Sequence, residues 1–166
     1  MTALLVTILL PLLVVIGGVF DFLTMRIPNW LNALIALSML AMALLLGMPL
    51  ETFGWHLLTG AVVLAVGFGL FAGGFIGGGD AKLLAAVALW MGWPQVVMFL
   101  VVTSLAGGAL AIAMKVWQAI RIEHTVRDTA WLKRVFRAEL DLPYGVAIAA
   151  GAVAAYPPSW WMQAVS

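Results

Sequence analysis

TALLVTILLPLLVVIGGVFDF, residues 2–22, carries a single charged side chain, Asp21, near its end. A helix needs roughly 20 apolar residues to cross a bilayer core of about 30 Å, and this run is long enough. No basic residue precedes the run and no small-residue cleavage site ends it, so it resembles a membrane span more than a removable signal peptide. We therefore expect a span at 3–22 that stays in the mature protein.

Similar apolar runs make up nearly the whole chain. Its 166 residues are 65% hydrophobic and only 9% charged. Proline and glycine clusters separate the runs, as expected at helix ends. The predicted spans are 3–22, 30–47, 55–73, 81–93, 95–115 and 143–160. The composition therefore predicts an all-α integral membrane protein, a bundle of about six transmembrane helices that forms one domain over residues 1–166.

The basic residues predict the orientation of the bundle. If the spans alternate, all eight lysines and arginines fall on one side, and Glu51 is the only charged residue on the other. Lys and Arg in short loops mark the cytoplasmic side. We therefore expect both termini outside and Asp21 and Asp80 near the cytoplasmic face of the membrane.

The connector 116–142 contains the only sustained polar stretch. Aromatic and aliphatic side chains between Trp131 and Leu140 recur at helical spacing beside basic ones. This pattern predicts an interfacial cytoplasmic helix against anionic lipid, and a solvated connector with a few anchoring aromatics fits equally well.

Several chemistries are excluded by composition. A net charge of +1 gives no electrostatic case for nucleic acid, and the absence of cysteine rules out disulfides and thiolate chemistry. His56 and His124 lie in separate segments without a carboxylate at ligand spacing, so we predict no metal and no cofactor.

Asp21 and Asp80 are the candidates for chemistry, because an ionised carboxylate in hydrocarbon costs roughly 2.5–3.5 kcal/mol at the bilayer centre. Each also has a structural interpretation. Asp21 can be an interfacial acid in a weak pair with Arg26. Asp80 can cap the helix that follows it, and capping does not exclude catalysis.

Three glycines precede Asp80, at Gly77, Gly78 and Gly79. Without Cβ atoms they allow unusual dihedral angles and the close approach of another backbone, such as a peptide substrate. In an aspartyl protease two carboxylates share a proton: one activates water and the other polarises the scissile carbonyl. Asp21 and Asp80 can form such a pair if the first and third spans pack together.

Three motifs in order resemble the type IV prepilin peptidases: Asp21 followed by Arg26-Ile27-Pro28-Asn29, then Gly77-Gly78-Gly79-Asp80-Ala81-Lys82-Leu83-Leu84, then Leu142-Pro143-Tyr144-Gly145-Val146-Ala147. The chain is most similar to the short form associated with Flp/Tad-type pili. The resemblance implies a GxGD aspartyl endopeptidase of type IV pilus biogenesis. It would remove the basic leader peptide of prepilin or pseudopilin substrates at the cytoplasmic membrane face, with Asp21 and Asp80 catalytic.

The same resemblance assigns Gly77, Gly78, Gly79, Lys82, Pro143, Tyr144 and Gly145 to the motifs around the site and the approach of substrate. Lys82 can help to keep Asp80 ionised, although a cytoplasmic anchor is the simpler role. Longer family members carry a Cys-x-x-Cys zinc segment and also methylate the new N-terminus. This chain has no cysteine, so we expect peptidase activity without methyltransferase activity.

Two other classes of protein also explain some of these residues. A small proton-coupled transporter can hold aspartates in its bundle, but such sites usually lie at the midplane and often come with internal repeats. A non-catalytic assembly scaffold can use the glycines for helix packing, but it leaves Asp80 without a role.

Overall fold

The structure, a computed structural model, describes residues 2–119 and 142–165. Every regular element in this part of the chain is an α-helix, which confirms the all-α class. The helices are α1 (Thr2–Thr24), α2 (Asn29–Leu45), α3 (Leu50–Ala72), α4 (Gly78–Ala119), α6 (Tyr144–Ala155) and α7 (Trp160–Gln163). The predicted interfacial segment falls within residues 120–141 and so lies outside the described residues.

Within residues 2–119 and 142–165, three helical stretches are long and apolar enough to cross a membrane: Ala3–Thr24, Leu50–Ala72 and Gln95–Val116. Large apolar side chains also cover the outside of the bundle, for example Leu44, Phe68 and Leu105, each more than 60% exposed. Side chains of this kind on an outer surface are expected where the solvent is lipid. A helical membrane bundle accounts for both observations.

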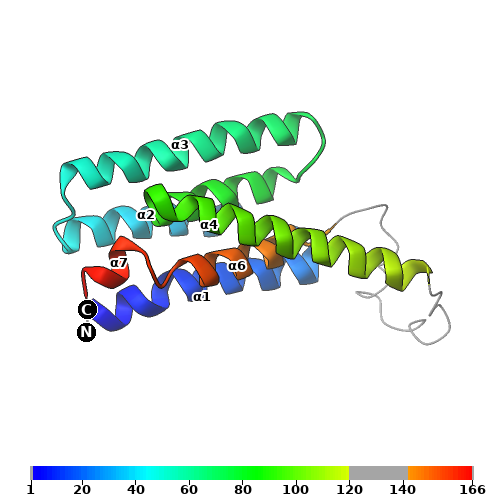
Figure 1. Cartoon of the computed structure of the whole chain (residues 1–166), viewed down its shortest axis with the longest axis horizontal. Coiled ribbons are helices and arrows are strands. Elements are labelled where there is room, and N and C mark those ends of the chain that lie inside the picture. The colour runs from blue at the N-terminus through cyan, green and yellow to red at the C-terminus, as the bar shows by residue number, and fades with distance from the viewer. Residues whose placement is uncertain (1, 120–141, 166) are drawn as a thin grey trace.

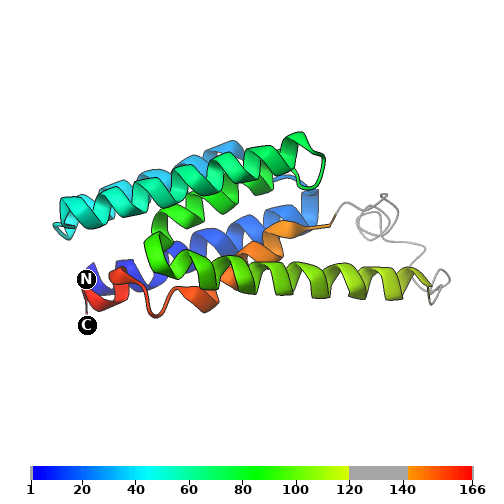
Figure 2. The ribbon, with the colours of Figure 1, turned by 45° about the horizontal axis from the view of Figure 1, so that its top comes forward.

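Helix α4 contains a reversal of the chain at Gly92-Trp93. Gly92 has a φ of 61°, in the left-handed region, and Trp93 is extended, so the helix is interrupted there. Figures 1 and 2 show the chain running to one end of the bundle before this point and back after it. The predicted spans 81–93 and 95–115 correspond to the two arms of α4.

Two buried side chains hold the reversal in place. His56 of α3 donates from Nδ1 to the carbonyl of Leu89 (2.6 Å), and Trp161 of α7 donates from Nε1 to the carbonyl of Trp90 (2.5 Å). The last carbonyls of a helix have no partner within it, so these bonds satisfy groups that would otherwise be unpaired in an apolar setting.

The last helical region differs from the predicted single span at 143–160. Helix α6 ends at Ala155, and α7 begins only at Trp160. Pro157 and Pro158 lie between them, and neither has a backbone N–H to continue the helical hydrogen bonds. The interruption allows Trp161 to reach back to the reversal in α4.

The chain order places distant segments at the same end of the bundle. The end of α1, the loop between α3 and α4 and the start of α6 lie together, whereas α7 lies beside the start of α1 at the other end (Figure 1). Helix α6 packs against both α1 and α4. Asp21, Asp80 and Tyr144 are therefore carried to one end of the molecule.

Candidate active site

Asp21 lies in the last turn of α1 and is only 6% exposed. Helix α1 ends just beyond it, where Met25 adopts a φ of 53° and donates its N–H to the carbonyl of Asp21 (2.7 Å). A left-handed residue is common just after a helix, although methionine rarely fills this position. The turn directs the chain into Pro28 and α2, and Asp21 remains turned toward the bundle.

Gly145 of α6 supplies a hydrogen-bond donor to Asp21. Its backbone N–H donates to Oδ2 of Asp21 at 2.7 Å, and the bond is buried. Because α6 starts at Tyr144, this N–H has no partner within its own helix, and the N-terminal end of a helix carries partial positive charge. A negative charge on Asp21 is stabilised there.

The approach of α6 to α1 requires glycine at position 145. A Cβ at Gly145 would lie 2.7 Å from Cβ of Asp21 and 2.9 Å from its Oδ2. Gly18 on α1 also packs closely against the start of α6, since a Cβ at Gly18 would lie 3.2 Å from the carbonyl oxygen of Gly145. A larger residue at position 145 would displace the Asp21 side chain.

Asp80 lies in the first turn of α4 and is 9% exposed. The helix begins at Gly78, so Asp80 is the third residue of the helix rather than its N-cap, and it contributes to capping only by reaching back to the residue before the helix. Its Oδ2 accepts the N–H of Gly77 at 3.3 Å, and a Cβ on Gly77 would lie 2.8 Å from that oxygen. Its Oδ1 is buried and has no hydrogen-bond partner among the described residues.

The two aspartates line one cavity of about 280 Å³ at this end of the bundle. It is also lined by residues from the end of α1, the α3–α4 loop and the segment before α6: Met25, Gly74, Phe75, Ile76, Gly77, Leu142 and Tyr144. The structure thus brings together two carboxylates that are far apart in the sequence.

The environment of Asp80 favours its protonated form. Asp80 precedes the predicted span 81–93, and burial together with the nearby Asp21 carboxylate raises the pKa of Asp80 from 3.8 to about 7, against the opposing hydrogen bond from Gly77. Two carboxyl groups in one cavity, one of them with a raised pKa, form an arrangement in which one carboxyl can donate a proton while the other accepts one.

Of the remaining motif residues, Tyr144 lines the cavity, and Gly78, Gly79 and Pro143 pack beside its lining. A Cβ on Gly78 would meet the ring of Phe71 at 3.2 Å, and one on Gly79 would meet Ile27 at 3.3 Å. Both glycines thus allow close helix and loop packing. Pro143 is buried at the start of α6, and the ring of Tyr144 packs against Gly107 of α4.

Lys82, although only two residues from Asp80, does not line the cavity with the aspartates. Its ammonium donates to Oδ1 of Asn29 at 2.8 Å, a bond that joins the starts of α4 and α2. Lys82 lines a separate groove between α2, α3 and α4 instead.

Several residues that contribute to this end of the bundle could not be predicted from the sequence. Met25, Gly74, Phe75 and Ile76 line the cavity, but they carry no reactive group that would single them out. Asn32 donates from Nδ2 to the carbonyl of Gly79 at 3.4 Å, next to Asp80. A buried amide within a predicted span was the one signal that could have found it.

No group of three or more His, Cys, Asp or Glu side chains within the described residues could hold a metal ion. The chemistry that these residues can supply is proton transfer between two carboxyl groups in a small cavity at the end of a helical bundle.

Comparison with known proteins gives one match. The profile of the type IV leader peptidase family matches residues 8–112, a range that includes both Asp21 and Asp80. No curated protein and no solved structure matches the chain.

Proposed function

The chain belongs to the type IV leader peptidase family, and we propose that it is a GxGD aspartyl endopeptidase of the membrane that removes the basic leader peptide of prepilin-like substrates. Asp21 and Asp80 form the catalytic pair. The observation that carries this proposal is that the two buried carboxyl groups, one on α1 and one on α4, line the same cavity.

The surroundings of the two aspartates support different roles for them. Asp21, held by the Gly145 N–H at the start of α6, acts as the carboxylate that takes a proton from water. Asp80 starts protonated and donates a hydrogen bond to the scissile carbonyl oxygen. Its Oδ1, which has no partner within the described part of the chain, is available for that contact.

The reaction then balances without a cofactor. Water adds to the carbonyl carbon while one of its protons passes to Asp21, and the proton of Asp80 passes to the carbonyl oxygen. When the tetrahedral intermediate collapses, the C–N bond breaks, the amine nitrogen takes the proton from Asp21, and Asp80 regains its proton from the intermediate. The peptide becomes a carboxylic acid and an amine, and both aspartates return to their starting states.

The position of the cavity supports a cut near the membrane surface. Both aspartates lie at the ends of their helices, so a bond at the bilayer midplane is out of reach. We propose that this end faces the cytoplasm of a bacterium with an inner membrane, where the basic leader of the substrate stays. The apolar helix of the prepilin lies in the bilayer beside the enzyme. Substrates of the Flp/Tad type fit the short form that the sequence resembles.

The direct test is cleavage of a defined substrate by the full chain in lipid vesicles. The substrate is a prepilin with a basic leader followed by an apolar helix, and mass spectrometry of its N-terminus reports the cut. We expect one cut at the boundary between leader and helix. A substrate that remains intact, or a new N-terminus deep within the apolar helix, would contradict the proposal. Uptake of protons by the same vesicles without any cleavage would favour a transporter.

A further inference from the structure

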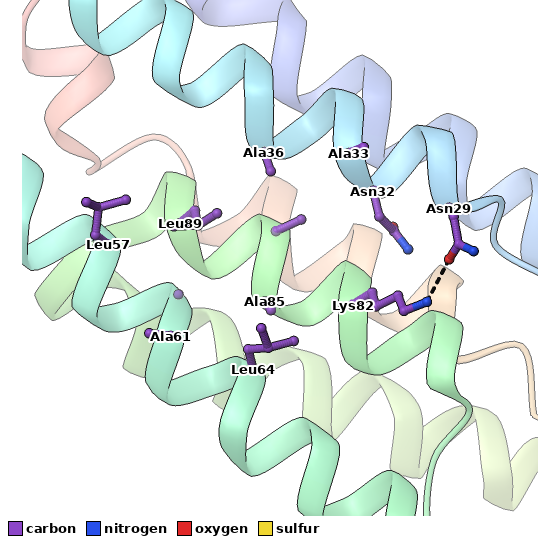
Figure 3. A pocket seen from close by; sticks show the side chains of 12 residues that line it. Asn29, Asn32, Ala33, Ala36, Leu57, Ala61, Leu64, Lys82, Ala85 and Leu89 are labelled. Atoms are coloured by element: carbon purple, nitrogen blue, oxygen red, sulfur yellow. Dashed lines mark hydrogen bonds between the residues drawn. The ribbon is translucent and has the colours of Figure 1, made fainter.

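A second groove, of about 490 Å³, lies between α2, α3 and α4, and neither aspartate lines it (Figure 3). Half of its lining residues are small and apolar, namely Ala33, Ala36, Gly60, Ala61, Ala85 and Ala86, and three leucines complete the apolar part. Polar side chains gather at one end only, namely Asn29, Asn32 and Lys82. We propose that this groove binds an anionic phospholipid, with an acyl chain along the alanines and the phosphate at Lys82.

The charge at the polar end supports an anionic head group. The Lys82 ammonium donates to Oδ1 of Asn29 at 2.8 Å, and this neutral amide does not cancel the positive charge (Figure 3). Asn32, which is 6% exposed, adds an Oδ1 that has no hydrogen-bond partner among the described residues. Basic pockets between transmembrane helices are known to bind acidic lipid head groups. A head group with hydroxyls, such as that of phosphatidylglycerol, also offers Asn32 a donor.

The length of the groove fits one leaflet of a bilayer. Lys82 at the polar end and Leu89 at the apolar end lie on the same arm of α4, seven residues apart. At a rise of 1.5 Å per residue this distance is about 10 Å, a third of a hydrocarbon core of about 30 Å. An acyl chain that enters beside Lys82 therefore stays within the leaflet at the Asp80 end of the bundle.

Native mass spectrometry of the full chain in detergent tests the proposal, with phosphatidylglycerol and phosphatidylcholine of equal chain length as probes. We expect Lys82→Gln to weaken phosphatidylglycerol binding about fivefold, the effect of one basic residue near an acidic head group, and to leave phosphatidylcholine unchanged. Lys82→Arg should restore it. Equal phosphatidylglycerol binding by the wild type and Lys82→Gln would overturn the assignment of the head group.

A second pair of variants tests the place of the acyl chain. Ala61→Phe fills the groove, whereas Val62→Phe adds the same ring one residue away on α3, at a position that does not line it. We expect Ala61→Phe, and not Val62→Phe, to weaken binding of both lipids. Equal binding by the two variants would contradict the proposal. A photo-crosslinker at position 61 should give an adduct with the mass of a phospholipid, and an adduct with a prepilin instead would assign the groove to substrate.

Discussion

Gly145 donates its backbone N–H to Oδ2 of Asp21 across 124 positions of sequence, at 2.7 Å. This bond joins the start of α6 to the last turn of α1 and fixes the carboxylate that we assign as the base. It also explains why a Pro-Tyr-Gly segment near the end of the chain accompanies an aspartate near its beginning. The tyrosine packs on α4 and the glycine allows α6 to reach Asp21.

Gly145→Ala should impair catalysis through this contact. The new Cβ would lie 2.7 Å from Cβ of Asp21, so the carboxylate must move. A displacement near 1 Å in an active site can cost about a hundredfold in rate, and we expect a loss of that order in initial cleavage rate. Gly108→Ala is the matched control, because a Cβ there meets nothing within 4 Å. Full activity of Gly145→Ala would show that the contact does not position Asp21.

Asp80→Asn should change the pH dependence of stability. The pKa of Asp80 is raised from 3.8 to about 7 in the folded protein. Between about pH 4 and pH 7 the unfolded chain therefore loses this proton while the folded protein keeps it, so the wild type becomes less stable as pH rises through this range. Above about pH 7 both states are ionised, and Asp80 adds no further pH dependence. Asparagine cannot ionise and so avoids this loss. The variant should therefore melt at a higher temperature than the wild type at pH 8, and the difference should shrink toward pH 5.

The control for this pH series is Glu51→Gln, at an exposed acid in the first turn of α3. It should show no comparable pH-dependent difference from the wild type. A gap between Asp80→Asn and the wild type that stays constant from pH 5 to pH 8 would argue that Asp80 titrates as an ordinary carboxyl.

Gly92→Ala should destabilise the reversal in α4. With φ 61° and ψ −178°, Gly92 lies in a backbone region that is essentially restricted to glycine and costs another residue about 1–3 kcal/mol, and here the Cβ would also lie 2.6 Å from Nε2 of His56. We expect a lower thermal unfolding midpoint in detergent than for Gly69→Ala, whose Cβ meets nothing within 4 Å. Equal midpoints for the two variants would show that the turn does not need glycine.

The orientation of the bundle can be measured with single thiols, because the chain has no cysteine of its own. Phe75→Cys lies in the α3–α4 loop at the Asp80 end, and Glu51→Cys lies at the start of α3 at the other end. In intact cells an impermeant reagent should label position 51 and not position 75, since the basic residues predict that the Asp80 end is cytoplasmic. The reverse labelling pattern would invert the proposed topology.

The order of helices and turns could be predicted from the sequence, because apolar runs and the Pro or Gly residues between them determine local structure. Gly92-Trp93-Pro94 is such a break, and the chain turns back there. The end of α6 was missed by five residues, since the apolar character of the run continues through Pro157 and Pro158. Hydropathy does not register the missing N–H groups of two prolines.

The candidate site could be predicted only in part from local sequence patterns. Asp21 and Asp80 were identifiable because acids are rare in membrane segments, and Gly77 because glycines cluster before Asp80. Their meeting in one cavity depends on how α1, α4 and α6 pack, which no local pattern encodes. Lys82 illustrates the limit: it is two residues from Asp80, yet its ammonium is directed to Asn29 and the groove between α2, α3 and α4.

The most direct test of the two-aspartate mechanism is the rate at which single asparagine variants cleave a prepilin in lipid vesicles. Asparagine preserves the size of the side chain and can still accept the hydrogen bonds from Gly145 and Gly77, so the bundle should remain folded. We expect Asp21→Asn and Asp80→Asn each to lower the rate at least about a hundredfold, with Glu51→Gln unchanged. The double variant should be no worse than the more impaired single one, because the two carboxyls act as a unit. Near-normal cleavage by either single variant would contradict the mechanism.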